Sequence, residues 1–238
     1  MKTNSDEEEP SREGLLLIDK PPGKTSFYLV QRLRHLTGID KIGHAGTLDP
    51  FATGVMLLLV GKSFTRLSEK FMQSDKQYLA TLQLGAVSTT YDCDGIITPY
   101  NPYVPSAEEI YRVLQGFQGE VLQTPPMYSA KKIKGKKLYE LARRGIEIAR
   151  EPQKVHLQTL LVEYHYPYLT LDVSCSKGTY IRSLAEDFGK ALGTGAYLEQ
   201  LVRLRCGEFY LEDCLSYDLL NSPEFDYTKH LLQPSMIC

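Results

Sequence analysis

Residues 43–54 read GHAGTLDPFATG and lead directly into the apolar run VMLLLV. The run is too short and too apolar for a surface helix, so we predict a central strand there. Three glycines in the preceding dozen residues allow a backbone or a ligand to approach closely. Asp49 is the only acidic residue between Asp40 and Glu69. The stretch therefore predicts a glycine-rich loop that carries one carboxylate to the entrance of a buried strand.

Asp49 has two interpretations from its sequence context alone. Asp before Pro50 is ordinary turn chemistry, and an Asp in this position can also cap a helix. The alternative is a catalytic acid, base or nucleophile, since His44 and the glycines lie close by in the chain. The sequence shows neither a Ser-His-Asp pattern nor a second carboxylate that would indicate hydrolase chemistry. Both interpretations remain open at this point.

Strand and helix patterns mix along the chain without a strict alternation. GLLLIDK at 14–20 predicts a buried strand, and a Pro-Pro-Gly turn precedes a helix that begins at Thr25 or Ser26 and ends at Gly38. Further strands are expected around an Asp94-Gly95 turn and on both sides of Pro167, and helices at 106–117 and 179–192. This mixture predicts the α+β class rather than a doubly wound sheet.

Composition bounds the class of protein. The 238 residues are 42% hydrophobic and 24% charged, as expected of a soluble globular chain. The polar, acidic N-terminus does not resemble a signal peptide, and no apolar run approaches the ~20 residues of a membrane span. The five cysteines are scattered, which argues against a disulfide framework or a zinc site and for a reducing, cytoplasmic location.

The net charge of −2 conceals an asymmetry. Residues 1–10 carry a net −3 and residues 211–238 a net −4, so residues 14–210 carry a net +5, because Arg12 and Glu13 cancel. A basic body suggests a polyanionic partner. We expect an acidic, disordered N-terminal tail at 1–13, a folded domain at 14–210 and a short acidic C-terminal tail at 211–238.

A basic segment lies at about 124–152, which we expect to be a long loop or hairpin. Its core, SAKKIKGKKLYELARR, lacks the regular apolar spacing of a buried face. Such a segment can neutralise phosphates while Tyr128 and Tyr139 stack on bases, although a solvated loop is equally compatible with the pattern. The basic residues concerned are Lys131, Lys132, Lys134, Lys136, Lys137, Arg143 and Arg144.

Arg182 falls in the first turn of the helix expected at 179–192. The positive end of the helix dipole disfavours a cation there. An arginine in such a place often has a carboxylate or phosphate partner. The alternative is an ordinary surface arginine.

Two short motifs do not support other functions. GKS at 61–63 lacks the earlier glycine of a phosphate-binding loop, because that position is Met56. DCDG at 92–95 lacks the glutamate that closes a calcium loop, because Tyr103 occupies that position, and a hairpin turn is the better interpretation. The histidines show no metal-binding spacing. We expect no metal and no nucleotide cofactor.

Taken together, six ordered blocks resemble the TruB family of tRNA pseudouridine synthases, from about residue 14 to 210. The blocks are DKPPGKTS, GHAGTLDPFATG, DKQYLATLQLG, PPMYSAKKIKGKKLYELARRG, SKGTYIRSLAEDFGKALG and LEQLVRLRCGEF. The resemblance implies the pseudouridine synthase fold, with a mixed, mostly antiparallel central sheet, flanking helices and a catalytic cleft. One departure is Ala45, where the family often has threonine.

The resemblance also implies roles for individual residues. Asp49 matches the catalytic aspartate, Tyr78 the tyrosine that stacks on the target base, and Arg182 the arginine that pairs with the aspartate. His44 matches the histidine that enters the RNA where the base has left. Leu201 matches the apolar residue that lines the pocket, and Lys20 and Pro21 match a supporting pair. Tyr78 is also a candidate for the base that removes a proton.

The implied reaction converts a uridine in the T loop of tRNA, at position 55 of the tRNA, to pseudouridine after base flipping. The expected partner is the T-arm stem-loop, with no cofactor, and the protein is expected to act as a monomer. Bacterial members usually continue into a C-terminal PUA domain, and we expect none in the residues after 210. The alternative is a tRNA-binding or tRNA-folding factor that acts without catalysis.

Overall fold

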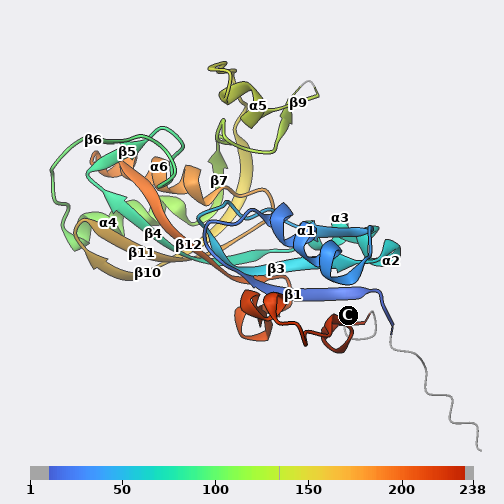
Figure 1. Ribbon diagram of the computed structural model, residues 1–238. Coiled ribbons are helices and arrows are strands. Elements are labelled where there is room, and N and C mark those ends of the chain that lie inside the picture. The colour runs from blue at the N-terminus through green and yellow to red at the C-terminus, as the bar shows by residue number, and fades with distance from the viewer. Residues whose placement is uncertain (1–10, 134, 234–238) are drawn as a thin grey trace, which may run out of the picture. The chain divides into compact units, whose positions relative to one another are not determined.

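The computed structural model describes residues 11–133 and 135–233, which form two compact units (Figure 1). The first unit comprises the chain up to Met72 together with the residues from Phe209 on, and the second comprises Gln73–Glu208. Lys134 and residues 1–10 and 234–238 lie outside the described residues.

The first unit is built on a small mixed sheet. Strand β1 (Gly14–Lys20) pairs antiparallel with β3 (Thr53–Val60), which also pairs antiparallel with β2 (Ile42–Ala45). Strand β14 (Leu215–Ser216) joins β1 in parallel. The predicted strand at VMLLLV is confirmed. Both β1 and β3 are buried along almost their whole length, so both of their faces are covered, which explains why these strands are apolar without alternation.

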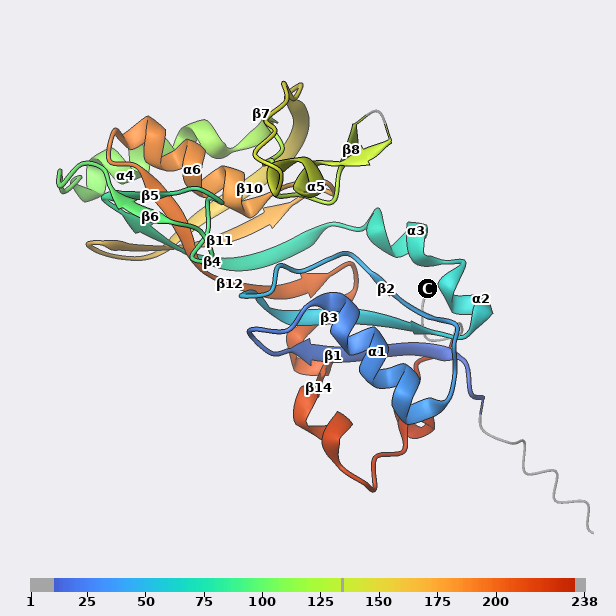
Figure 2. The ribbon, with the colours of Figure 1, turned by 45° about the horizontal axis from the view of Figure 1, so that its top comes forward.

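Helix α1 (Ser26–Thr37) packs against β2 and β3 (Figure 2). Its ends were correctly predicted: the Thr25 hydroxyl accepts a hydrogen bond from the Tyr28 N–H, and Gly38 takes the left-handed conformation at φ 70°. Two short helices, α2 (Lys62–Thr65) and α3 (Ser68–Met72), follow β3.

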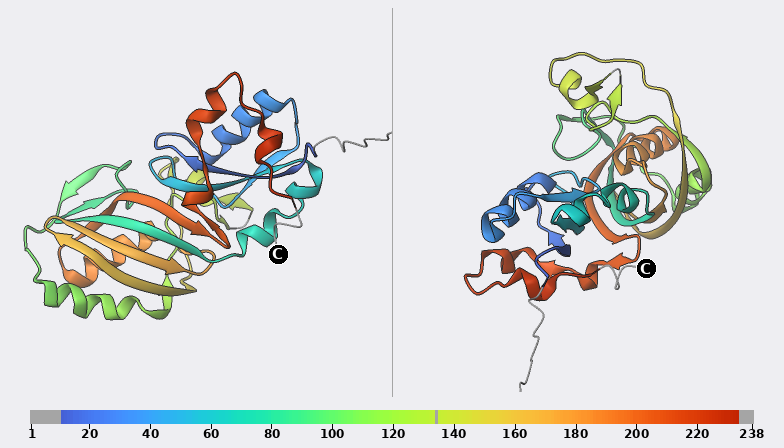
Figure 3. Two further views of the ribbon diagram at one scale, coloured as in Figure 1. Left: turned by 90° about the horizontal axis from the view of Figure 1, so that it is seen from below. Right: turned by 90° about the vertical axis from the view of Figure 1, so that its right-hand side faces the viewer.

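Residues 211–233, which were expected to be a short acidic tail, are folded as part of the first unit. After β13 (Phe209–Tyr210), the chain forms three 3₁₀ helices, drawn in red in Figure 3: η2 (Leu211–Asp213), η3 (Tyr217–Asn221) and η4 (Tyr227–His230). Of these, η3 packs against β1 and α1. Leu220 is fully buried, and the Tyr28 and Tyr217 hydroxyls lie 3.1 Å apart. The expected N-terminal disorder likewise does not extend to Glu13, whose carboxylate accepts hydrogen bonds from the Lys62 and Ser63 N–H groups.

The second unit contains a five-stranded antiparallel sheet in the order β12-β4-β11-β10-β7. The strands are β4 (Lys76–Leu84), β7 (Gly119–Gln123), β10 (Gln153–His165), β11 (Tyr168–Cys175) and β12 (Ala196–Cys206). Burial alternates strictly along β4, so one face of the sheet forms the core. Helices α4 (Ala107–Leu114) and α6 (Ile181–Leu192) cover that face (Figures 2 and 3).

The remaining elements of the second unit are short. The capping box predicted for α4 is present, with Ser106 and Glu109 as its partners, and η1 (Gln115–Phe117) follows the helix. The hairpin β5 (Ala86–Ser88) and β6 (Ile97–Pro99) is joined by residues 89–96, and the turn expected at Asp94-Gly95 lies within this longer connection, where the Gly95 N–H donates to the Asp92 carbonyl at 3.4 Å. The basic segment contains the small hairpin β8 (Lys132–Ile133) and β9 (Lys136–Lys137), then α5 (Leu138–Ala142). The α+β class with a mixed, mostly antiparallel sheet and flanking helices is thus confirmed.

Candidate active site

The loop that carries Asp49 is tied to the chain that connects β1 to α1. The Lys20 ammonium is fully buried and donates to the carbonyls of Pro21 at 2.8 Å and Pro50 at 3.0 Å. The Gly23 N–H donates to the same Pro50 carbonyl at 2.8 Å. The segments DKPPGKTS and GHAGTLDPFATG are therefore held together by hydrogen bonds in the folded protein.

Ser26 makes the second connection between these segments. Its hydroxyl accepts from the Leu48 N–H at 2.9 Å and donates to the Leu48 carbonyl at 3.1 Å. Ser26 and Leu48 are both buried, so these bonds are shielded from water. Asp49, half-buried, is held between Leu48 on one side and Pro50 on the other.

The end of the Asp49 loop, where the chain enters β3, requires a glycine. Gly54 has φ 102°, a conformation that side chains other than glycine rarely adopt, and its N–H donates to the Asp19 carboxylate at 3.1 Å. The Ala52 N–H donates to the Asp49 carbonyl at 3.2 Å, which closes a turn. The turn interpretation of Asp49 is thus correct for its backbone. Upstream of the loop, His44 lies half-buried on β2, opposite Leu58.

Tyr78 and Leu201 lie on the core face of the sheet in the second unit. Tyr78 is opposite Arg203 in the β4–β12 pair, and Leu201 is opposite Ala80, so Leu201 and Arg203 share the face of Tyr78. Arg203 is 1% exposed and hydrogen-bonds to the Tyr78 phenol. Arg203 was not predicted as a site residue from the sequence, although VRLRC places two arginines, Arg203 and Arg205, among the apolar residues of β12.

Burial decides the protonation state of Tyr78. The loss of hydration raises the pKa of its phenol to about 12, against the opposing effect of the charge and hydrogen bond of Arg203. At neutral pH the side chain is therefore a protonated phenol that can stack and donate a hydrogen bond. It is not a ready proton acceptor in this state, which argues against Tyr78 as the resting general base.

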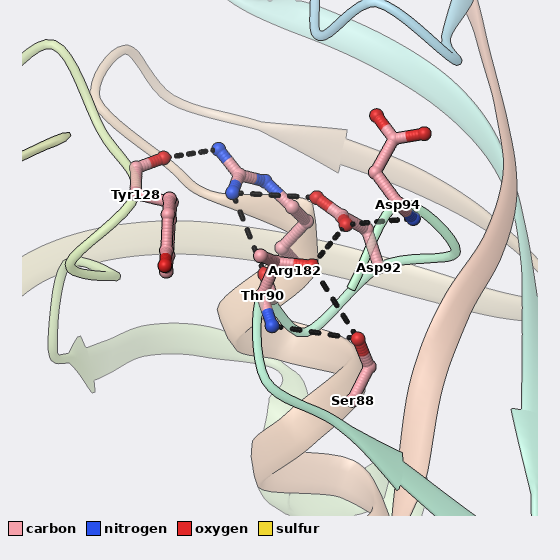
Figure 4. Close-up of polar contacts among 6 residues, drawn as sticks. All are labelled: Ser88, Thr90, Asp92, Asp94, Tyr128 and Arg182. Atoms are coloured by element: carbon pink, nitrogen blue, oxygen red, sulfur yellow. Dashed lines mark hydrogen bonds and ion pairs between the residues drawn. The ribbon is translucent and has the colours of Figure 1, made fainter. Parts of the chain in front are cut away.

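Arg182 stands at the start of α6 and is 5% exposed (Figure 4). Its guanidinium lies 3.4 Å from the Asp92 carboxylate and donates to the carbonyls of Tyr128 at 2.8 Å and Thr90 at 3.5 Å. The expected carboxylate partner is therefore present. The resemblance implies a pair between Arg182 and Asp49, and the ion pair within the second unit joins Arg182 to Asp92.

Asp92 is itself held on several sides. One of its oxygens accepts from the Asp94 N–H at 3.1 Å and from the Thr90 hydroxyl (Figure 4). With 4% of its surface exposed, the carboxylate is oriented by the turn and by Arg182 together. From its sequence, DCDG was interpreted only as a turn, and Asp92 was therefore not predicted as a partner of Arg182.

Most of the basic segment is exposed. Lys132, Lys136, Arg143 and Arg144 are exposed, and Lys131 and Lys137 are half-exposed, whereas Lys134 is outside the described residues. The Tyr139 ring has the Lys137 ammonium 5.4 Å and the Arg143 guanidinium 5.3 Å from its centre. These cation–π contacts hold two of the charges beside an aromatic ring.

A pocket of about 310 Å³ lies between residues 89–91 and both ends of the basic segment. Thr90 and Tyr128, whose carbonyls accept from Arg182, line it together with Tyr91 and Arg150. The hydrogen bonds that Arg182 donates to these two carbonyls therefore support the wall of this pocket.

The predicted site residues thus gather in two groups. Lys20, Pro21 and the loop of Asp49 are joined in the first unit, and Tyr78 and Leu201 share the sheet face that α6 covers in the second. Within 11–133 and 135–233, no three His, Cys, Asp or Glu side chains are grouped as metal ligands would be. Over the same ranges, no helix combines the length and apolar character of a membrane span.

Comparisons of the sequence identify a family and several named relatives. Residues 34–181 match the model of the TruB family pseudouridylate synthase, N-terminal domain. The tRNA pseudouridine synthase B of Chlamydia pneumoniae is 52% identical, over 92% of this chain and 94% of its own length. That of Protochlamydia amoebophila is 56% identical, over 86% and 78%, and that of Clostridium kluyveri 42%, over 88% and 73%.

A solved structure supports the same relationship. A chain in the crystal structure of a Cbf5-Nop10-Gar1 complex superposes with a TM-score of 0.71 at 28% identity. The match covers 94% of this chain but 58% of that one, so the protein spans little more than half of that neighbour. The α+β sheet, the ordered motifs and the high identity agree, and the chain belongs to the TruB family of pseudouridylate synthases.

Proposed function

We propose that this protein converts uridine at position 55, in the T loop of tRNA, to pseudouridine. The named relatives are tRNA pseudouridine synthases, and the basic segment offers exposed charges for an RNA backbone. The reaction is an isomerisation: the bond from ribose C1′ to uracil N1 breaks, the base turns, and C1′ bonds to C5. The C5 proton leaves and N1 gains one, so no cofactor is consumed.

One observation carries the assignment of Asp49. Its neighbours on both sides, Leu48 and Pro50, are held by hydrogen bonds. These bonds come from Lys20 at the end of β1, Gly23 in the β1–α1 connection and Ser26 at the start of α1. A loop needed only to change direction does not require a fully buried lysine to hold it. Such bracing is what fixes a reactive group in position for catalysis.

The other residues take the roles that their environments allow. Tyr78, a protonated phenol, stacks on the flipped uracil, and Leu201 on the same sheet face completes an apolar wall. Arg182 keeps the catalytic carboxylate ionised by charge and hydrogen bonding. His44 occupies the gap that the flipped base leaves in the RNA, because a base inside a folded loop is otherwise unreachable. The lysines of the basic segment hold the phosphates.

The decisive experiment maps pseudouridine in a T-arm stem-loop incubated with the wild type, with Asp49→Asn, and with Asp40→Asn as a matched control in the same unit. We expect conversion at one uridine by the wild type and by the control, and none by Asp49→Asn, which should still bind the RNA. Turnover by Asp49→Asn would refute its assignment. If no variant forms pseudouridine but all accelerate tRNA refolding, the protein is a folding factor.

A further inference from the structure

Gln123 binds the start of the helix that carries Arg182. It is the last residue of β7 and is 3% exposed. Its side-chain oxygen accepts from the Tyr180 N–H at 2.7 Å, and its side-chain nitrogen donates to the Tyr180 carbonyl at 3.0 Å. One amide therefore binds both backbone groups of the residue that precedes α6.

Two more bonds join the same helix start to the chain that follows Gln123. The Ser183 hydroxyl donates to the Thr124 carbonyl at 2.9 Å, and the Arg182 guanidinium donates to the Tyr128 carbonyl at 2.8 Å. Residues 123–128 are the entry to the basic segment. The first turn of α6 and this entry are thus connected at three points.

Glutamine is well suited to bind the backbone at the start of α6. Helix starts are usually capped by Ser, Thr, Asp or Asn, but the residue before α6 is Tyr180. An acidic residue reaching in from β7 could accept from the Tyr180 N–H but could not donate to the Tyr180 carbonyl. A neutral amide supplies both a donor and an acceptor without adding charge.

We propose that Gln123 is a positioning residue for the isomerisation. By fixing the backbone of Tyr180, it sets the direction in which Arg182 leaves the helix. It also joins the catalytic arginine to the segment whose lysines hold the RNA, so that binding of the phosphates and placement of the guanidinium are coupled. The inference rests on the proposed function of this site.

The expected effect is on the rate rather than on RNA binding. Gln123 is buried and at the strand end, so its loss removes no phosphate contact. A displacement of about 1 Å in a catalytic group can lower a rate by about 100-fold. For Gln123→Met, which keeps the length of the side chain, we expect kcat to fall about 10- to 100-fold, with KM and the Kd for RNA within about 3-fold of the wild type.

The chain contains a matched control in Gln118. Its amide binds Thr159 in the same manner: it accepts from the Thr159 N–H at 3.1 Å and donates to the Thr159 carbonyl at 2.7 Å. Thr159 lies on β10, away from the start of α6 in the chain. Gln118→Met removes these two bonds and the one that the amide donates to the Thr159 hydroxyl at 2.8 Å, so it should lower stability by at least as much as Gln123→Met while leaving kcat unchanged.

The experiment measures single-turnover pseudouridine formation, RNA affinity and urea unfolding for the wild type, Gln123→Met, Gln123→Glu and Gln118→Met. Gln123→Glu keeps the acceptor for Tyr180 and should fall in kcat even if Gln123→Met does not fold. Wild-type kcat in the folded Gln123 variants, or an equal loss of kcat in Gln118→Met, would overturn the inference. An inactive wild type would instead refute the proposed function.

Discussion

Arg182 and Asp92 form a buried ion pair in which the guanidinium and the carboxylate are 3.4 Å apart. Each charge compensates the other in a place that water does not reach. Removal of one partner takes a charged contact out of a buried place, which costs about 1.5–3 kcal/mol. Because Asp92 also accepts from the Asp94 N–H and the Thr90 hydroxyl, it orients the arginine and the turn together.

Asp92→Asn should therefore lower both stability and rate. Asparagine keeps an oxygen for the two hydrogen bonds but not the charge, so we expect the free energy of unfolding to fall by about 1.5–3 kcal/mol. Pseudouridine formation should slow by at least about 10-fold, because Arg182 loses its fixed orientation. Denaturant unfolding and single-turnover assays measure these effects. The exposed neighbour serves as control: Asp94→Asn should stay within about 0.5 kcal/mol. Wild-type rate and stability in Asp92→Asn would contradict the role.

The Arg182 pair shows what sequence reasoning can and cannot reach. A cation in the first turn of a helix predicted a carboxylate or phosphate partner, because the dipole alone disfavours it. The identity of the partner depended on how a hairpin and a helix, far apart in the chain, pack together. No local pattern in DCDG reports that packing, so Asp92 was seen only as a turn residue.

Ser26 should affect catalysis through the loop of Asp49. In Ser26→Ala the Leu48 N–H and carbonyl lose their buried partner, which costs about 1–3 kcal/mol. Because Leu48 precedes Asp49, we also expect kcat to fall at least 10-fold. Thr25→Ala removes the α1 cap, worth about 1 kcal/mol, without touching the loop. Thr25→Ala should lose about as much stability as Ser26→Ala, but its kcat should equal that of the wild type. Equal kcat values in both variants would mean that Ser26 only stabilises the fold.

The sequence predicted which faces of a strand are covered wherever its pattern of apolar residues reflects burial directly. The unbroken apolar residues of β3 match a strand covered on both faces, and the alternation of β4 matches a sheet with one core face. The C-terminal residues gave no such pattern. They are acidic and lack apolar periodicity, and their docking depends on single side chains such as Leu220, which only the tertiary structure reveals.

Tyr78 should make the protein sensitive to high pH. Its folded pKa of about 12 exceeds the ordinary value of 10.0, so the folded state retains a proton that the unfolded state has lost between these values. The stabilising contribution is therefore complete below pH 10 and is lost as the pH rises through about 12. A shift of this size corresponds to about 3 kcal/mol. Urea unfolding at pH 9 to 12 should show a smaller loss of stability in Tyr78→Phe than in the wild type. If the free energy of unfolding falls equally with pH in both proteins, the raised pKa of Tyr78 is contradicted.

The basic segment should determine the salt dependence of RNA binding. Lys132 and Lys136, on the two strands of its hairpin, are both exposed. Each phosphate contact contributes about 0.7–0.9 to the slope of log K against log salt, because bound counterions are released. Replacement of both lysines by glutamine should therefore flatten the slope by about 1.5 and weaken binding. A charge-matched control replaces Lys154 and Lys229, exposed lysines outside the segment that pair with Glu120 and Asp226. Binding titrations between 50 and 200 mM salt, a range of about fourfold, compare the two. An equal change of slope in both double variants would mean that general charge, rather than this segment, attracts the RNA.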